Sequence, residues 1–131
     1  DEEIQQFLLL QEEGFTSLSP KPKSSEEISY FRHILGTGKG CICFWKNLPV
    51  SVGMHTSPLE GITEILGVTT LKEHRRRGIA SALIGRIVKA CFSKGIHTCY
   101  LTAANHEVQR IYGKLGFSPL LTMLSYTLQQ S

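Results

Sequence analysis

The sequence lacks the apolar run that a membrane span requires. A transmembrane helix needs about 20 consecutive apolar residues, and no segment of the 131-residue chain has that character. No secretory signal is visible either. We therefore expect a cytoplasmic protein with no membrane partner.

Cysteines are few and are not spaced for metal or redox chemistry. There are four of them, with no Cys-x-x-Cys pair and no spacing that suits zinc. All lie in predicted strands or on the apolar face of a predicted helix, which favours reduced thiols packed as small hydrophobes. We expect no metal site from Cys41, Cys43, Cys91 and Cys99.

A large excess of charge of one sign is also missing. The formal net charge is +3, from 14 Lys and Arg against 11 Asp and Glu, and the cations are dispersed except at Arg75–Arg77. A nucleic-acid partner is therefore not expected, and one anionic cofactor suits the charge better. The length and the 41% hydrophobic content indicate one domain over residues 1–131, with a helical segment at 1–38 and a sheet core at 39–131.

The most informative stretch is Arg75-Arg76-Arg77-Gly78-Ile79-Ala80, where three cations lead into the start of a predicted helix. Glycine lets a phosphate approach the backbone, and the first helical turn offers unpaired N–H groups. The helix dipole adds partial positive charge at the same point. A diphosphate fits such a site. A solvated basic face explains the run alone equally well, so the flanking segments decide.

The flanks place this stretch between a strand and a helix. Residues 64–71 are β-branched and apolar, which predicts a buried strand. Apolar residues with helical spacing follow the stretch, and Lys94-Gly95 stops that helix. The predicted order continues with a strand at His97–Ala103, a helix from Asn105 to the glycine stop at Gly116, and a further strand after Phe117.

The N-terminal half is predicted to hold two helices and an antiparallel meander. Residues 2–13 have the apolar spacing of a helix, and Ser24 with Glu27 forms a capping box that begins a second one. Strands at Cys41–Trp45 and Val50–Thr56 then lead through turns into the strand at 64–71.

Two motifs now carry a family resemblance. The first is Arg-x-x-Gly-x-Ala at residues 75–80, directly after a strand. The second is Asn105-x-x-Val108-x-x-Ile111-Tyr112-x-Lys114-x-Gly116-Phe117. Together they resemble the GCN5-related N-acetyltransferase (GNAT) superfamily over residues 40–128. Val108 stands where alanine is common, which is a small change of volume.

The resemblance implies a mixed α/β fold. A mostly antiparallel, twisted sheet of about six strands carries helices on both faces, and the cofactor lies at a splay between the two central parallel strands. In this family a first strand usually precedes two helices. Here the first predicted element is a helix, so that strand is either missing or belongs to residues upstream of Asp1.

The same resemblance implies acetyl-CoA as cofactor. The pantetheine arm is expected to run beside the strand at Val68–Thr70, so that a backbone N–H near Val68 or Thr69 faces the thioester carbonyl. Asn105 is expected to cap its helix and to contact the same arm. The implied cofactor-binding residues are Val68, Thr69, Thr70, Arg75, Arg76, Arg77, Gly78, Ile79, Ala80, Ser81 and Asn105.

Tyr112 is the candidate general acid, because the family places a hydroxyl near the thioester sulfur at this position. A phenol with a pKa of about 10 is protonated at neutral pH and can donate to a forming thiolate. The alternative is a tyrosine that packs as one more residue of the apolar helix face.

Glu64 is the candidate general base. It lies eleven residues before Arg75, the spacing of the catalytic glutamate in the histone-acetyltransferase branch of the family. Strand alternation predicts one shared face for Glu64, Leu66, Val68 and Thr70. Its carboxylate could accept an amine proton directly or through a water. A strand-end glutamate paired with a neighbouring cation explains it equally well, and Glu60 and His55 are reserve candidates.

These observations predict an acetyl-CoA-dependent N-acetyltransferase, acting on a primary amine by direct attack in a ternary complex. The alternative is a GNAT-like domain that binds CoA without turnover and has a regulatory or structural role. We expect a small-molecule or peptide acceptor and a monomer or homodimer. Acceptor selectivity is assigned to residues 10–35 and 116–126, which show no recognisable acceptor motif.

Overall fold

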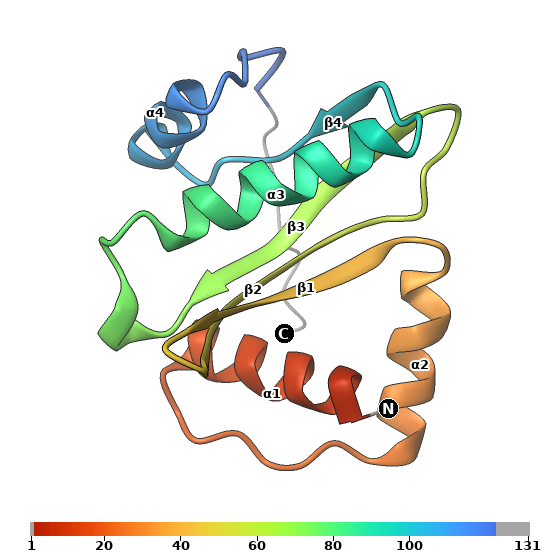
Figure 1. Ribbon diagram of the computed structural model, residues 1–131, viewed down its shortest axis with the longest axis vertical. Coiled ribbons are helices and arrows are strands. Elements are labelled where there is room, and N and C mark those ends of the chain that lie inside the picture. The colour runs from red at the N-terminus through yellow and green to blue at the C-terminus, as the bar shows by residue number, and fades with distance from the viewer. Residues whose placement is uncertain (1, 123–131) are drawn as a thin grey trace, which may run out of the picture.

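A computed structural model describes residues 2–122 as a sheet between helices (Figure 1). Helix α1 lies on one face of the sheet with α2 beside it, whereas α3 crosses the other face and α4 lies next to α3. The elements in chain order are α1 (Glu2–Thr16), α2 (Ser25–Leu35), β1 (Lys39–Trp45), β2 (Leu48–His55), β3 (Ile62–Thr70), the 3-10 turn η1 (Lys72–His74), α3 (Ile79–Ser93), β4 (Thr98–Tyr100) and α4 (His106–Lys114).

The sheet has the order β1-β2-β3-β4 and mixed strand directions. The pairs β1/β2 and β2/β3 are antiparallel, and β3/β4 is parallel. The predicted mixed α/β fold, with a mostly antiparallel sheet and helices on both faces, is thereby confirmed. The described residues form four strands rather than about six. The strand expected after Phe117 does not form over residues 117–122, and residues 123–131 lie outside the described range.

Strand β3 contains a bulge that overturns the predicted alternation. Val52 is opposite Thr69 and Met54 is opposite Leu66, so two residues of β3, Gly67 and Val68, lie opposite Gly53 alone. Gly67 has a φ of +65°, a conformation that glycine adopts without steric cost. The expectation that Leu66 and Val68 share a face is therefore wrong: Leu66 packs on the α1 side and Val68 on the α3 side.

Two apolar clusters, one on each face, hold the helices in place. On one face, Phe7 and Leu10 of α1 are buried against Val52 and Met54 of β2. On the other face, a stripe of α3 is buried against Ile65, as its helical spacing predicted; the stripe comprises Leu83, Ile84, Ile87 and Cys91. Burial of this kind contributes about 25 cal/mol for each Å² of apolar surface.

The helix ends follow the local sequence signals. Ser24 Oγ accepts from Glu27 N at 3.1 Å, and Ser24 N donates to the Glu27 carboxylate at 2.8 Å, so the predicted capping box of α2 is present. Asn105 Oδ1 accepts from Val108 N at 2.9 Å and caps α4.

Strand β4 is shorter than the predicted strand at 97–103. Among the described residues, no helix is long and apolar enough to cross a membrane.

Candidate functional site

The parallel strands β3 and β4 separate beside the segment of β3 that is predicted to bind the cofactor. Their pairing runs from Ile62 with Thr98 to Glu64 with Tyr100, where β4 ends. Beyond that point, a cavity of about 220 Å³ lies between the second half of β3, the start of α3 and the inner side of α4. Its lining residues are Val68, Thr69, Thr70, Arg75, Ala80, Ser81, Ile84, Val108, Ile111 and Tyr112.

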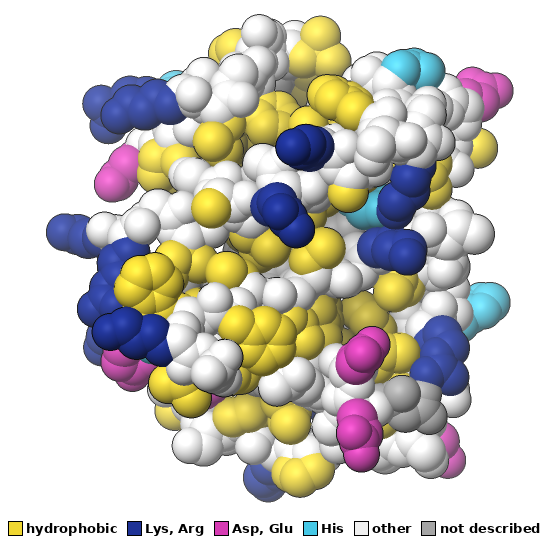
Figure 2. Space-filling view, viewed as in Figure 1, with side chains coloured by type: hydrophobic (Ala, Val, Ile, Leu, Met, Phe, Trp, Pro, Cys, Tyr) yellow, Lys and Arg dark blue, Asp and Glu magenta, His cyan; other side chains and the backbone are white. Residues whose placement is uncertain are grey.

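The loop from η1 into α3 has the features of an anion site. Gly78 is the N-cap of α3 with a φ of 75°, and nothing lies within 4 Å of the position that a side-chain Cβ would occupy there. The backbone therefore stays open to an approaching group. The first-turn amides of Ile79, Ala80 and Ser81 have no partner within the helix. Figure 2 shows Lys and Arg side chains gathered along the left edge of the molecule, where this loop lies in Figure 1.

Of the three arginines, Arg75 is engaged with the protein itself. Its Nε donates to the Thr70 carbonyl at 2.9 Å, and one terminal nitrogen donates to the Gly14 carbonyl at 2.6 Å. Arg75 thus ties the loop to β3 and to the end of α1. Arg76 and Arg77 are exposed. Their exposed side chains are accessible to a phosphate.

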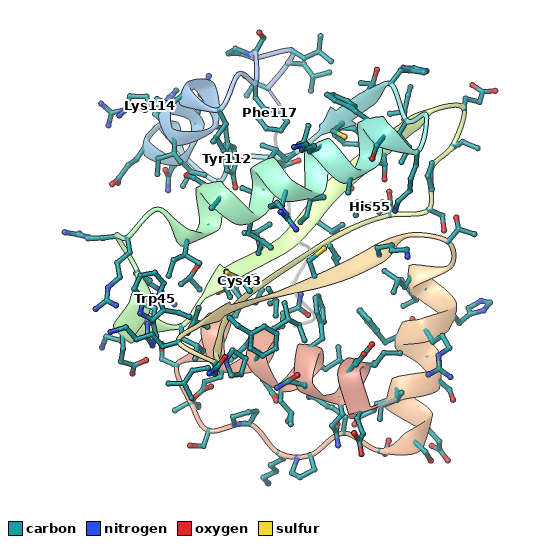
Figure 3. The ribbon with its side chains drawn as sticks, in the orientation of Figure 1. Cys43, Trp45, His55, Tyr112, Lys114 and Phe117 are labelled. Carbon is teal, nitrogen blue, oxygen red and sulfur yellow. The ribbon has the colours of Figure 1, made fainter. Side chains whose placement is uncertain are left out.

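Tyr112 projects from α4 towards α3 and lines the cavity (Figure 3). Its ring lies 6.3 Å from the Phe117 ring, centre to centre, at an interplanar angle of 57°. Burial of the half-buried phenol raises its pKa above the ordinary value of 10. The hydroxyl therefore stays protonated at neutral pH, as a proton donor must.

The candidate bases lie away from this cavity. Glu64 does not line it and is four residues from Val68, or about 13 Å along a strand. Glu64 is half-buried, and its backbone N–H donates to Thr56 Oγ1 at 3.1 Å. Alternation with buried Ile65 places its side chain on the α1 face.

The two reserve bases are less well placed. His55 is only 2% exposed, its Nδ1 lies 2.9 Å from the Thr56 carbonyl, and Figure 3 shows it far along the sheet from Tyr112. Glu60 lies in the exposed loop before β3, and its carbonyl lies 3.1 Å from His97 Nε2. Neither side chain lines the cavity.

Sequence reasoning missed several residues of the site. Ile84, Val108 and Ile111 line the cavity but were not predicted as site residues. Gln11 and Gly14 of α1 were not singled out, although they contact β3 and the loop. A signal for the bulge was present, because an isolated glycine in a strand pattern indicates a bulge. No local sequence pattern predicted that Gln11 and Gly14 of α1 would contact β3 and the loop.

A larger open hollow of about 500 Å³ lies between α1, the loop that follows it, α2 and the start of β2. Its lining contains two carboxylates and no Lys or Arg, and the cavity beside α3 suits an anionic cofactor better for that reason. The lining residues are Glu2, Gln5, Gln6, Leu9, Leu10, Glu13, Pro20, Ile28 and Pro49.

The comparison with protein-family models gives the class of protein. The model of the acetyltransferase (GNAT) family matches residues 5–117, so the chain belongs to the GNAT acetyltransferase family. This is a family of acyltransferases that use acetyl-CoA, and the open glycine and the unpaired amides of this chain fit the diphosphate of that cofactor. A search of curated proteins finds no match.

Solved structures share the fold over almost the whole chain. An acetyltransferase from Trypanosoma brucei is 22% identical, with a TM-score of 0.76 and coverage of 98% of this chain and 95% of that one. Glucosamine-6-phosphate N-acetyltransferase from Arabidopsis thaliana is 16% identical, with a TM-score of 0.74 and the same coverages. A protein from Clostridium acetobutylicum described as a predicted acetyltransferase, solved with acetyl-CoA, is 18% identical, with a TM-score of 0.69 and coverage of 96% of this chain and 90% of that one.

Proposed function

We propose that the protein transfers the acetyl group of acetyl-CoA to a primary amine, by direct attack of the amine in a ternary complex. The observation that carries this proposal is the cavity at the strand splay. It brings the β3 segment Val68–Thr70, the start of α3 and the Tyr112 side chain together around one space. We favour a small-molecule amine as the acceptor, with a peptide amine as the alternative acceptor class. We place the reaction in the cytoplasm.

The cofactor-binding roles follow the geometry of the loop and of the strand edge. The amides of Gly78, Ile79, Ala80 and Ser81 would hold the diphosphate, with Arg76 and Arg77 adding charge. Val68, Thr69 and Thr70 would pair with the pantetheine arm through their backbone, because β4 no longer occupies that edge. Asn105 and Arg75 would act by holding α4 and the loop in place.

The residues of the chain divide the chemistry between them. The bound thioester supplies an activated acetyl group. A backbone N–H near Val68 would donate to the carbonyl oxygen as it becomes negative. As the amine nitrogen forms its bond to the acetyl carbon and the carbon–sulfur bond breaks, Tyr112 would donate its proton to the departing sulfur. The amine would lose its own proton to water, with Glu64, which lies outside the cavity, as the proposed final acceptor.

The role of Glu64 predicts a particular pH dependence. We expect Glu64→Gln to lower kcat most at low pH, with partial recovery at high pH, where more of the acceptor amine is already neutral. Steady-state rates from pH 6 to 9 would measure this. Glu73→Gln, at an exposed position of η1, serves as the matched control. Parallel profiles of parent and Glu64→Gln would remove Glu64 from the mechanism.

A CoA-binding domain without turnover is the second candidate function. The position of Glu64 outside the cavity favours it, because no carboxylate is among the residues that line the reaction space. The two functions separate in one assay, an acetyl-CoA-dependent screen over amino acids, polyamines, aminoglycosides, amino sugars and peptide N-termini. CoA binding without acetylation of any acceptor would support the silent domain.

Cofactor selectivity gives a test that needs no acceptor. We expect acetyl-CoA and CoA to stabilise the protein while ATP and NAD do so weakly, because the site joins a diphosphate loop to a strand edge that suits pantetheine. A ligand at about 100 times its dissociation constant adds about 2.7 kcal/mol to the free energy of unfolding. Thermal unfolding with each nucleotide measures the effect. Equal shifts from ATP and CoA would reduce the site to a general anion site.

A further inference from the structure

Gln11 lies on α1 with its side-chain amide directed at the bulge in β3. Its Nε2 donates to the Gly67 carbonyl at 3.2 Å. A side-chain Cβ at position 67 would collide with that same nitrogen, so the glycine and the glutamine fit each other closely. The bond gives the Gly67 carbonyl a partner at the bulge, where the register between β2 and β3 shifts.

Helix α1 contacts the cofactor strand at a second point as well. At Gly14, a Cβ would come within 2.6 Å of the Thr69 side chain, and the Gly14 carbonyl accepts from Arg75. Thr69 and Arg75 both line the cavity. The inner side of α1 therefore supports the bulge, the strand after it and the loop into α3.

The Gln11 bond also fixes the direction of a backbone donor. The Gly67 carbonyl and the Val68 N–H belong to one peptide unit, and in a trans peptide these two groups point in opposite directions. Gln11 holds the carbonyl towards α1. The Val68 N–H is therefore directed away from α1, to the side on which Val68 packs against α3 and lines the cavity.

We propose that Gln11 is a positioning residue for acetyl transfer, which holds the Gly67–Val68 peptide so that the Val68 N–H meets the thioester carbonyl. The inference rests on the proposed function, since it concerns the same site. Gln11 contacts β3 only through the Gly67 carbonyl among its recorded hydrogen bonds, and it does not line the cavity. It acts through one peptide group, and loss of such a donor, or a shift of about 1 Å, typically lowers a rate by about 10²-fold.

A purely structural role of Gln11 predicts something different. Phe7 and Leu10 are buried between α1 and the sheet, so the helix remains docked without the Gln11 bond. Structural loosening would affect stability and cofactor affinity together. Misdirection of the Val68 N–H would lower kcat and leave the affinity for CoA unchanged, because CoA has no acetyl carbonyl.

The experiment uses two variants. Gln11→Met keeps the side-chain length but has no hydrogen-bond donor, and Gln11→Glu places an ionised carboxylate next to the Gly67 carbonyl. We expect kcat to fall about 10-fold in the first and about 100-fold in the second, with the Kd for CoA within about 3-fold of the parent. Gln6→Met and Gln6→Glu, at an exposed position of α1, are the matched controls and should leave both quantities unchanged.

A second readout does not depend on turnover. With valine labelled by ¹⁵N, the amide proton of Val68 should shift between the CoA complex and the acetyl-CoA complex of the parent protein, and this difference should vanish in Gln11→Met. If the parent protein acetylates an acceptor and the Gln11 variants have the same kcat, the inference is wrong while the proposed function stands. Equal losses of kcat and CoA affinity would also overturn it. A parent that does not bind acetyl-CoA would overturn the proposed function and the inference with it.

Discussion

Gly78→Asp is expected to abolish CoA binding while the protein stays folded. The position has a φ of 75°, and the Cβ of an aspartate there would meet no atom within 4 Å beyond its chain neighbours. Asp and Asn tolerate this left-handed conformation better than other side chains. The carboxylate would then occupy the place of the diphosphate, in front of the unpaired amides of the first turn of α3.

Gly78→Asn is the matched control for this prediction. It has the same shape and the same backbone tolerance but no charge, so it isolates the electrostatic part of the effect. We expect CoA affinity at least about 100-fold lower in Gly78→Asp than in Gly78→Asn, which corresponds to about 2.7 kcal/mol. Arg75→Ala should weaken binding less, because the backbone donors remain. Calorimetric titration with CoA measures all three, and unchanged affinity in a folded Gly78→Asp would contradict the location of the site.

Tyr112→Phe should keep the affinity for CoA within a few-fold and lower kcat by about 10²-fold, the usual scale for loss of a positioned acid. The ring of phenylalanine preserves the contact with Phe117 and the packing against α3, so the cavity keeps its shape. Only the proton donor to the departing sulfur is lost. Steady-state kinetics with acetyl-CoA and a true acceptor, together with CoA titration, separate the two quantities.

Tyr100→Phe on β4 is the control, because it removes an exposed phenol that does not line the cavity. The pH profile adds a further check. Burial raises the pKa of Tyr112 above 10, so the acid remains protonated as pH rises and its contribution should persist through pH 9. Turnover of Tyr112→Phe at the parent rate over pH 6 to 9 would favour positioning and the backbone donor alone as the source of catalysis.

The sequence predicted those parts of the site that arise from neighbouring residues. Three cations, a glycine and an apolar helix stripe follow one another along the chain, and their local rules gave the loop into α3 and its N-terminal amides. The caps at Ser24 and Asn105 are likewise local, since each bonds an amide three residues away. Such features need no knowledge of tertiary contacts.

The parts that the sequence did not predict depend on contacts between distant segments. Gln11 meets Gly67 and Arg75 meets Gly14 across 56 and 61 positions of the chain. A helix pattern does not say which carbonyl its polar residue will reach. The bulge then reversed the face of Val68, because one extra residue in a strand exchanges the two faces for everything beyond it.

Gly14 shows what close support of a functional strand demands of a helix. A glycine inside a helix lowers its stability by about 0.5–1 kcal/mol relative to alanine, so replacement by alanine is a usual way to stabilise a protein. Here a methyl group at position 14 would come within 2.6 Å of the Thr69 side chain and push α1 away from β3. Glycine at position 14 lowers the intrinsic stability of α1 but allows the helix to pack closely against β3. An alanine at position 14 would therefore favour α1 as an isolated helix but displace it from the strand that is expected to bind acetyl-CoA.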